Sequence, residues 1–413
     1  MNFLKKQSPV RIISLGFALV ILIGSVLLSL PYSIRDGVTL RYIDALYMST
    51  SAVCVTGLLT VDAGDTFTPL GQFFLCMLIQ IGGLGVTAVG TGVILAMGKK
   101  INLKARNLIR EAGNLDSGKG VIRFIRLVFR KKFPPLKAAG VSLFHSVASF
   151  NNSGFDILGG GQNLIPYQDD ILLNLVTCAL VIFGGIGFLV IREVIAKRFR
   201  WKKLSMHAKV VLFMSLVLTA AGTVLLKLTE DITWMGAFFT SVSARTAGFS
   251  TFPLGSFSGA GLLTVIVLMV IGASPGSTGG GIKTTTCYVL FEGIRSSATN
   301  TSEKAFRYAV PTDAFRKAAV ITLLAIGIVL SGTYILVILE PGVPFLDALF
   351  EMSSAFGTAG LSTGISAGLC DAAKILTILI MFIGRLGPLT IASLWYFTKG
   401  ERVSYPEGNI AIG

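Results

Sequence analysis

Four short segments of the chain share a glycine flanked by small residues. They are Val53–Leu58, Asn151–Phe155, Arg245–Phe249 and Gly357–Leu361. Each follows a short run rich in serine and aromatic residues, and each lies between long apolar runs. Glycine has no Cβ, so backbone carbonyl groups can approach a shared axis at these points. Four such segments at the mouth of one membrane bundle predict a cation filter.

The carbonyl groups around each glycine are the candidate ion ligands, because carbonyl dipoles can replace the hydration shell of a monovalent cation. A helix before each segment would aim its negative C-terminal end at the same axis. One segment alone could equally serve helix packing, but four in the same place of the same unit favour a filter. The candidate ligand residues are Val55, Thr56, Gly57, Asn152, Ser153, Gly154, Thr246, Ala247, Gly248, Thr358, Ala359 and Gly360.

A glycine-rich break interrupts the apolar run Gly261–Ile271, and no straight helix tolerates its composition. Irregular backbone at membrane depth is tolerated only where it lines a cavity. We therefore expect a mobile constriction, or gate, below the filter; a simple helix kink is the alternative. The candidate gate residues are Gly272, Ser274, Pro275, Gly276, Gly279, Gly280, Gly281 and Arg385.

The same break matches two enzyme motifs. Gly272–Gly276 fits the G-x-S-x-G nucleophile pattern, and Gly276–Thr284 nearly fits a phosphate-binding loop. Ile282, however, interrupts the Gly-Lys-Thr sequence that the phosphate loop requires. A serine hydrolase needs a base, and the two histidines, His145 and His207, lie in a predicted pore helix and in a basic loop. We expect no enzymatic activity.

Two arginines lie close to these features. Arg385 lies inside the apolar run Ile375–Pro388, where an arginine is costly and usually faces a cavity or a cluster of carbonyls. We expect it to project into the inner pore as an electrostatic barrier, with a helix-packing anchor as the alternative. Arg245 is predicted to bond pore-helix carbonyls or an acidic neighbour behind the filter. The glycines of Gly82–Ala88 are predicted to serve close packing.

Composition places this chain in the membrane. Its 413 residues are 53% hydrophobic and 14% charged, with a mean hydropathy of +0.75, which is too apolar for a soluble globule. The net charge of +15 comes from basic residues clustered between apolar runs, as expected of cytoplasmic loops, so nucleic acid is not an expected partner. The first run, Val10–Leu30, is long enough to span and is predicted to be a retained helix with a cytoplasmic N-terminus.

The predicted fold is an all-α integral membrane protein of four pseudo-repeats around a central pore. Each repeat would contain a helix, a pore helix, a filter and a second helix; the repeats are residues 1–98, 99–192, 193–293 and 294–413. The predicted first helices are Val10–Leu30, Val210–Leu228 and Ala318–Leu339. The predicted pore helices are Tyr42–Ala52, Val141–Phe150, Trp234–Ala244 and Leu346–Ala355. The predicted second helices are Leu70–Met97, Ile171–Ile191, Gly261–Ile271 and Ala373–Phe397.

The second repeat is predicted to lack its first helix. Val121–Lys132 carries too many cations to cross lipid, because each costs roughly 2.5–3.5 kcal/mol at mid-bilayer, and it is predicted to be an interfacial helix. The basic segment Lys99–Lys137 is predicted to be mostly cytoplasmic. Acidic residues fall on the opposite side and are predicted to form a vestibule that concentrates cations. They are Asp62, Asp65, Asp156, Asp169, Asp170, Glu230, Asp231 and Glu340.

Over essentially its whole length, the chain resembles the Trk/Ktr/HKT superfamily of potassium transporters, and specifically a Ktr-type membrane subunit. The four glycine segments, the break Gly272–Lys283, Arg385 and the closing Tyr405–Glu407 carry the resemblance. It implies filter glycines at Gly57, Gly154, Gly248 and Gly360, a gate at Gly272–Gly281 and a mid-pore arginine at Arg385. Glycine at all four positions fits potassium preference, since serine at the first is associated with sodium transport in some relatives.

The resemblance further implies potassium uptake across the plasma membrane, with K⁺ as substrate at the filter carbonyls and with no covalently bound cofactor. Na⁺ is the expected coupling ion. The implied partners are a second copy in a homodimer, a cytoplasmic ring of RCK-type nucleotide-binding subunits and the lipid bilayer. Both termini are expected in the cytoplasm.

The chain departs from this family in the second repeat, where about twenty residues, one membrane span, are expected to be absent after Phe129. Phe133–Ser142 would then have to thread upward inside the protein, or the copy would assemble poorly. The alternative reading of function is therefore a non-conducting or defective member of the family.

Overall fold

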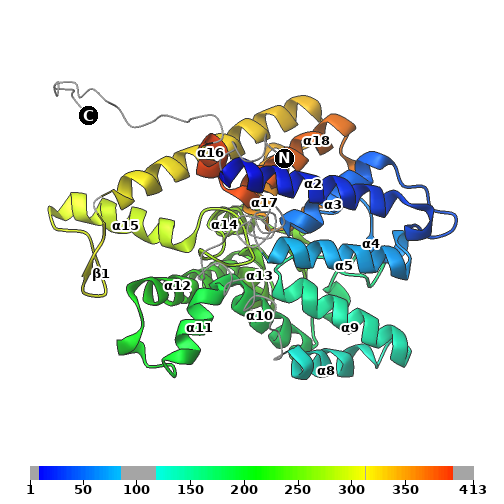
Figure 1. Cartoon of the computed structure of the whole chain (residues 1–413), viewed down its shortest axis with the longest axis horizontal. Coiled ribbons are helices and arrows are strands. Elements are labelled where there is room, and N and C mark those ends of the chain that lie inside the picture. The colour runs from blue at the N-terminus through cyan, green and yellow to red at the C-terminus, as the bar shows by residue number, and fades with distance from the viewer. Residues whose placement is uncertain (1–8, 85–117, 312, 394–413) are drawn as a thin grey trace.

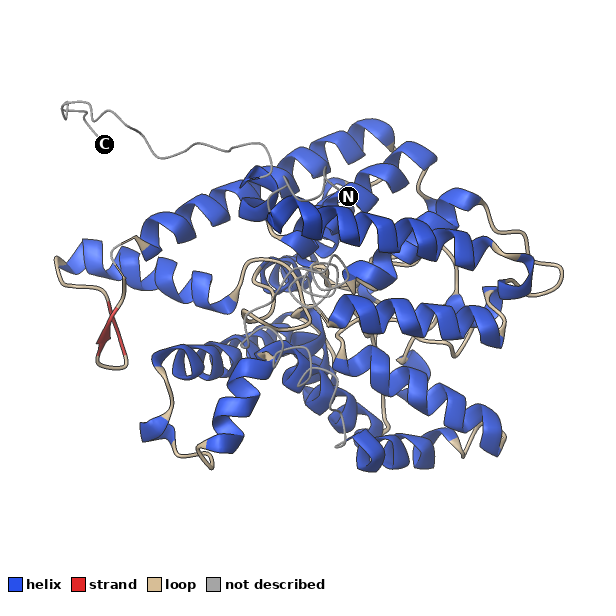
Figure 2. Ribbon diagram, in the orientation of Figure 1, coloured by secondary structure: helices blue, strands red, loops and turns tan. Residues whose placement is uncertain are grey.

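The computed structural model describes residues 9–84, 118–311 and 313–393. Helices make up nearly all of the regular structure in these ranges (Figures 1 and 2). Their only sheet is an antiparallel hairpin of β1 (Lys304–Ala305) and β2 (Tyr308–Ala309), in which Lys304 pairs with Ala309. The last part of the predicted helix Leu70–Met97, most of the basic segment after Lys99 and the closing Tyr405–Glu407 lie outside the described residues.

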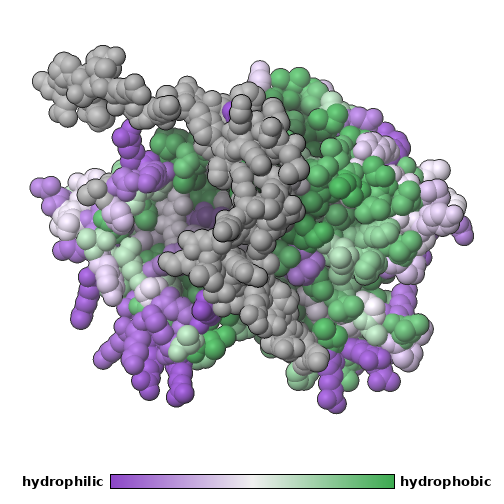
Figure 3. Space-filling view, viewed as in Figure 1, coloured by the Kyte–Doolittle hydropathy of each residue, from purple (hydrophilic) through white to green (hydrophobic). Residues whose placement is uncertain are grey.

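Three described helices are long and apolar enough to cross a membrane, and a bent pair would make a fourth. The three are α2 (Pro9–Ser29), α12 (Met206–Thr229) and α16 (Ala314–Leu339). Their exposed faces carry large apolar side chains, as on α2, where Leu19 and Leu22 are exposed. Figure 3 shows apolar residues over much of the visible face, with hydrophilic ones gathered toward its edges. This pattern supports the predicted membrane location.

Each long helix packs against a shorter helix that follows it in the chain. The shorter helices are α3 (Tyr42–Cys54), α9 (Pro135–Phe150), α13 (Trp234–Ala244) and α17 (Phe345–Gly357). In the second group the preceding helix is α8 (Gly118–Phe129), which packs on α9 as α2 packs on α3. Figure 1 shows the groups arranged about a common centre. These short helices are the predicted pore helices. α13 has the predicted bounds, and the other three extend one to six residues beyond their predicted bounds at one or both ends.

A second helix follows each short helix, and three of the four are interrupted. They are α5 (Pro69–Gly83), α10 (Ile171–Ile186) with α11 (Phe188–Ala196), α14 (Gly259–Val270) with α15 (Thr284–Thr299), and α18 (Asp371–Leu386) with α19 (Pro388–Ser393). The single helices predicted over Ile171–Ile191 and Ala373–Phe397 are therefore each divided in two within the described residues. The chain turns at Gly187 (φ 91°) and Gly387 (φ 92°), and α11 bends by 97° from α10. Glycine takes this backbone conformation without the Cβ clash of other residues.

Short elements complete the described fold. They are α4 (Ala63–Thr66) and five 3₁₀ turns at Pro31–Ser33, Ile165–Tyr167, Trp201–Lys203, Leu254–Ser256 and Ser366–Gly368.

Glycines bring the second helices close to the pore helices. A Cβ added to Gly82 would strike the carbonyl of Val53 at the end of α3, and one added to Gly83 would strike the side chain of Asn151. Gly184 and Gly384 meet the ends of α9 and α17 in the same way. The predicted packing role is confirmed for Gly82 and Gly83, while Gly85–Ala88 lies outside the described residues.

Several of the acidic residues predicted to line a vestibule instead cap helices. Glu230, just after α12, accepts hydrogen bonds from the backbone N–H and hydroxyl of Ser258, the residue before α14. Glu340, just after α16, accepts one from the backbone N–H of Cys370, the residue before α18. A carboxylate at a helix N-terminus satisfies free N–H groups and complements the helix dipole. Each of these two carboxylates therefore joins the first helix of its repeat to the second helix of the same repeat.

The second repeat enters its pore helix from the filter-mouth side. The Nζ of Lys132, in the turn between α8 and α9, donates to the carbonyl of Pro166 at 3.4 Å and lies 4.1 Å from the ring centroid of Tyr167. The adjacent Ile165 lines the outer cavity described below. This end of Lys99–Lys137 therefore lies beside the outer cavity, and the mostly cytoplasmic placement of the segment stays a prediction.

The helix α8 serves as the first wall of this repeat. Its described part, Gly118–Phe129, packs on α9 and ends just before the turn that leads into that helix. Its last residue, Phe129, is fully buried against His145 of α9 and Tyr167. From Pro135 onward, Phe133–Ser142 forms the first turns of α9.

A buried ion pair joins the first and fourth groups. The Nζ of Lys374 in α18 lies 2.6 Å from Oδ1 of Asp44 in α3, with both side chains less than 10% exposed. Arg41 contacts Asp44 and also Asp371, at 3.2 and 3.0 Å.

Breaking this pair from one side should destabilise the protein. We expect Asp44→Asn to cost about 3 kcal/mol, because it leaves the Lys374 ammonium buried and unpaired. The double replacement Asp44→Leu with Lys374→Leu should recover most of the loss. Thermal unfolding in detergent measures both, with Lys317→Met in the exposed Asp313–Lys317 pair as the control, where little change is expected. Equal destabilisation by the single and double variants would contradict this account.

Candidate functional site

The four predicted filter glycines meet in a closed ring. A Cβ added to Gly57 would lie 3.2 Å from the Cα of Gly154, and one on Gly154 would lie 2.7 Å from the Cα of Gly248. The corresponding distances are 3.1 Å from Gly248 to Gly360 and 2.9 Å from Gly360 to Gly57. The shorter second repeat therefore still delivers its glycine to the ring.

The carbonyls before the glycines follow the same order around the ring. A Cβ on Gly154 would lie 3.0 Å from the carbonyl oxygen of Ala247, and one on Gly248 would lie 2.8 Å from that of Ala359. The carbonyl of Ser153 lies against Gly57 and that of Thr56 against Gly360 in the same manner. The site thus brings together carbonyl oxygens from all four segments, with no room for a side chain at any glycine.

The backbone alternates in the same way in all four segments. Each glycine has a positive φ, from 68° at Gly154 to 97° at Gly57, and so does the residue two places earlier. Those earlier residues are Val55 (φ 56°), Asn152 (φ 59°), Thr246 (φ 74°) and Thr358 (φ 48°). Left-handed backbone is unfavourable for β-branched residues and persists only where the surroundings enforce it, most often at functional sites.

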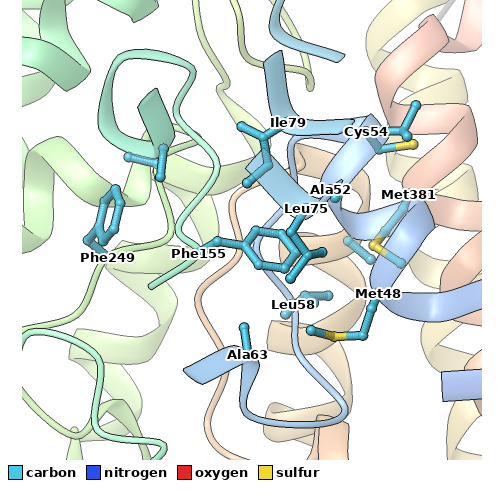
Figure 4. Close-up of a cluster of buried hydrophobic side chains, with 14 of the residues drawn as sticks. Met48, Ala52, Cys54, Leu58, Ala63, Leu75, Ile79, Phe155, Phe249 and Met381 are labelled. Carbon is cyan, nitrogen blue, oxygen red and sulfur yellow. The ribbon is translucent and has the colours of Figure 1, made fainter. Parts of the chain in front are cut away.

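A buried apolar residue anchors each segment directly after its glycine. Leu58, Phe155 and Phe249 are fully buried, and Leu361 is 2% exposed. Figure 4 shows Phe155 pointing from the second segment toward Leu58 and Leu75 of the first repeat. The segments are therefore held by packing across repeats as well as within them.

Polar groups of the pore helices tie the segments from behind. The hydroxyl of Ser51 accepts a hydrogen bond from the backbone N–H of Gly57 at 3.0 Å, and the hydroxyl of Ser243 donates to the carbonyl of Phe249. In the fourth repeat the fully buried carboxylate of Glu351 accepts from the hydroxyls of Ser362, at 2.8 Å, and Ser366.

A cavity of about 470 Å³ lies directly outside the ring, and its lining includes Gly57, Gly248 and Gly360. Asp62 and Asp156 contribute carboxyl groups to it. Burial raises the pKa of Asp156 to about 7, and the charges of Asp62 and Asp65 act in the same direction. This shift disfavours the charged form of Asp156 and so weakens its expected contribution to an acidic vestibule.

The glycine-rich break lies directly below the ring as a loop between α14 and α15. The backbone N–H of Gly280 donates to the hydroxyl of Thr358 at 2.8 Å, and a Cβ on Gly279 would clash with the side chain of Thr246. Since both threonines belong to the filter segments, the predicted gate touches the predicted filter directly. A helix kink alone does not describe this loop.

Several bonds hold the loop in place. Its two ends are joined by a bridge between Ile271 and Ile282, and Ser274 bonds the Thr284 hydroxyl at 2.9 Å. The backbone N–H of Ser274 donates to the carbonyl of Gly185 in α10 at 3.0 Å. The Nζ of Lys283 donates to the carbonyl of Gly279 at 2.7 Å.

Arg385 lies beside this loop, where the sequence placed it. Its buried guanidinium donates to the carbonyl of Thr278 in the loop and to that of Gly82 at the end of α5. These carbonyl partners are the ones expected of a helix-packing anchor. The role of Arg385 as a barrier in the pore stays a prediction. Arg245 lies behind the filter as predicted, but it donates to the carbonyl of Ser215 in α12 rather than to a pore helix.

The hydrolase motif finds no support in this geometry. The Ser274 hydroxyl is fully buried and bonded to Thr284, whereas His145 bonds Thr177 of α10 at 2.9 Å. In the described part of the chain, no group of three or more histidine, cysteine or acidic residues could hold a metal ion.

Comparison with known proteins places the chain in a family. The model of the TrkH family, described as cation transport protein, matches residues 124–230 and 205–397. The chain belongs to the TrkH/Ktr family of cation transporters. It is 36% identical to the Ktr system potassium uptake protein B of Bacillus subtilis (strain 168), covering 98% of this chain and 97% of that protein. It is 34% identical to the potassium/sodium uptake protein NtpJ of Enterococcus hirae, covering 99% and 98%.

The fold of this TrkH/Ktr chain also resembles a solved structure. The potassium transporter TrkH from Vibrio parahaemolyticus superposes with a TM-score of 0.73, over 92% of this chain and 84% of that one, at 20% identity. The TrkH/Ktr family is one of transporters, which agrees with the expectation of no enzyme. The family resemblance predicted from the sequence is confirmed.

Sequence reasoning missed some residues that hold the site. Glu351 is an ionisable residue in the middle of a predicted pore helix, a signal that by itself marks a functional candidate. Asn163 and Lys283 gave no such signal, because both lie in loops whose partners are set only by the fold.

Proposed function

We propose that this protein is the membrane subunit of a potassium uptake system and passes K⁺ through the ring of carbonyls at Gly57, Gly154, Gly248 and Gly360. The observation that carries the proposal is the closed ring, with the same alternating backbone in all four segments. Carbonyl oxygens in such an arrangement can replace the hydration shell of K⁺. The outer cavity supplies the ring from one side, and the loop Gly272–Gly281 with Arg385 gates it on the other.

The proposal extends to the surroundings of the pore. The subunit would lie in the plasma membrane with both termini in the cytoplasm, form a homodimer and bind a cytoplasmic ring of RCK-type nucleotide-binding subunits. It would need no covalently bound cofactor, and uptake of its substrate K⁺ would depend on Na⁺. The names of the relatives, a potassium uptake system protein and a potassium/sodium uptake protein, support the two ions named here.

Flux through purified protein tests the proposal. Proteoliposomes should take up K⁺ faster than Na⁺, and added Na⁺ should raise the K⁺ rate. The chain should also restore growth to a bacterium that lacks potassium uptake. Empty liposomes and liposomes with the Gly360→Ala variant are the controls. Absence of K⁺-dependent flux from well-folded protein would overturn the proposal.

A non-conducting subunit is the second candidate, and gaps in the alignment with the Bacillus protein favour it. The alignment with the Bacillus protein runs over 438 positions, more than the 413 residues of this chain, so it opens gaps in this chain. Inserting an apolar segment of about twenty residues after Phe129 tests this candidate. Growth of the uptake-deficient bacterium only with the insertion would favour the non-conducting subunit, whereas growth without it would exclude that reading.

A further inference from the structure

The second filter segment is held in large part by its neighbours. The carboxylates of Asp62 and Asp65, in the first repeat, accept hydrogen bonds from the backbone N–H groups of Gly161 and Gly160, each at 2.7 Å. The side-chain amide of Asn151 donates to Oε1 of Gln80 in α5 at 2.9 Å. The position of this segment is therefore set in part by bonds that cross between repeats.

One further bond of this kind reaches the filter itself. The Nδ2 of Asn163 donates to the carbonyl oxygen of Gly154 at 3.1 Å. Its Oδ1 accepts from the backbone N–H of Ser250, two residues beyond Gly248, at 3.3 Å, and from that of Leu164 at 2.9 Å. One side chain therefore connects the second and third filter segments at the floor of the outer cavity, whose lining includes Asn163.

The backbone fixes this side chain in place. Asn163 has φ 49°, a left-handed conformation that asparagine tolerates better than most residues. The backbone N–H of Leu164 also bonds the carbonyl of Ser250 at 3.1 Å, and the Leu164 side chain is fully buried. The amide is thus presented by an anchored loop.

The Gly154 carbonyl is thereby distinguished from its three counterparts. Within the described ranges, no side chain donates a hydrogen bond to the carbonyl of Gly57, Gly248 or Gly360. A donor occupies one of the two lone pairs of a carbonyl oxygen and fixes the direction in which the other points. Without this donor, the Gly154 carbonyl can rotate toward the axis of the ring and coordinate a smaller ion.

We propose that Asn163 is a positioning residue that sets the preference of the filter for K⁺ over Na⁺, by holding the Gly154 carbonyl at the distance that suits the larger ion. The inference rests on the proposed function, since it concerns the same ring. It adds a determinant outside the four glycine segments.

The test compares ion flux through reconstituted variants. Asn163→Leu removes the donor and the acceptor at similar size, whereas Asn163→Asp keeps the acceptor for Ser250 and removes only the donor. Both should lower the ratio of K⁺ to Na⁺ flux about fivefold to tenfold, the scale of one lost hydrogen bond. Gln162→Leu, the neighbouring position on the same cavity, is the matched control and should keep the wild-type ratio.

The outcomes separate the inference from the proposed function. Wild-type discrimination in both Asn163 variants would overturn the inference, as would loss in Asn163→Leu with full retention in Asn163→Asp, because the donor would then be irrelevant. Unfolding midpoints far below wild type in both variants would assign Asn163 a merely structural role and also overturn it. A wild-type protein without K⁺ flux would instead defeat the proposed function.

Discussion

Gly360→Ala is expected to lower K⁺ flux by roughly a hundredfold, the cost of about a 1 Å misplacement at a preorganised site. The new Cβ would lie 2.9 Å from the Cα of Gly57 and would overlap the carbonyl oxygen of Thr56. Both obstacles are backbone atoms of the ring, so they cannot rotate away as a side chain would. The residue would also have to keep φ 82°, which alanine adopts only with strain.

Gly368→Ala provides the matched control for this variant. Gly368 follows in the same external loop, yet a Cβ there meets no atom within 4 Å. Flux at the wild-type rate is therefore expected, and both variants should be compared by ⁸⁶Rb⁺ uptake into proteoliposomes at equal protein content. If Gly360→Ala transported K⁺ as fast as Gly368→Ala, the ion pathway could not run through this ring.

Sequence patterns predicted the elements of this fold well where the signal is local. The pore helix Trp234–Ala244 has the predicted bounds because Thr233 caps its start, the Thr233 hydroxyl accepting from the backbone N–H of Gly236, and because the glycine segment ends it. The four filter glycines were also found from sequence, since a repeated small-residue pattern needs no knowledge of the fold. Their contact with one another is observed, and their role as K⁺ ligands stays a prediction.

Sequence patterns were insufficient where long-range contacts decide the outcome. The bend at Gly187 and the position of α8 depend on contacts with other helices. The periodicity of the local sequence does not indicate either of them. The bonds from Asp62 and Asp65 to Gly161 and Gly160 join residues 99 and 95 positions apart, so no local pattern indicates them. For the same reason Asn163 could be recognised only in the structure.

Arg385→Gln is expected to raise K⁺ flux about tenfold in the absence of any regulatory subunit. The guanidinium is bonded to Thr278 in the gate loop and to Gly82 in α5, and so ties the loop to the first repeat. A hydrogen bond from a charged group contributes about 1.5–3 kcal/mol, and losing about 1.4 kcal/mol of this from the closed state shifts the closed-to-open ratio tenfold. Removing a positive charge beside the pathway acts in the same direction.

Arg385→Lys separates the two effects. Lysine keeps the positive charge but lacks the planar fork that lets one side chain reach two carbonyls in fixed directions. If the bonds hold the gate, Arg385→Lys should conduct nearly as fast as Arg385→Gln; if the charge alone is the barrier, it should resemble wild type. Both variants should be measured by ⁸⁶Rb⁺ uptake and by unfolding midpoint. A fall in flux in both variants, with midpoints unchanged, would mean that Arg385 supports the open pathway and that the loop Gly272–Gly281 is not held closed by it.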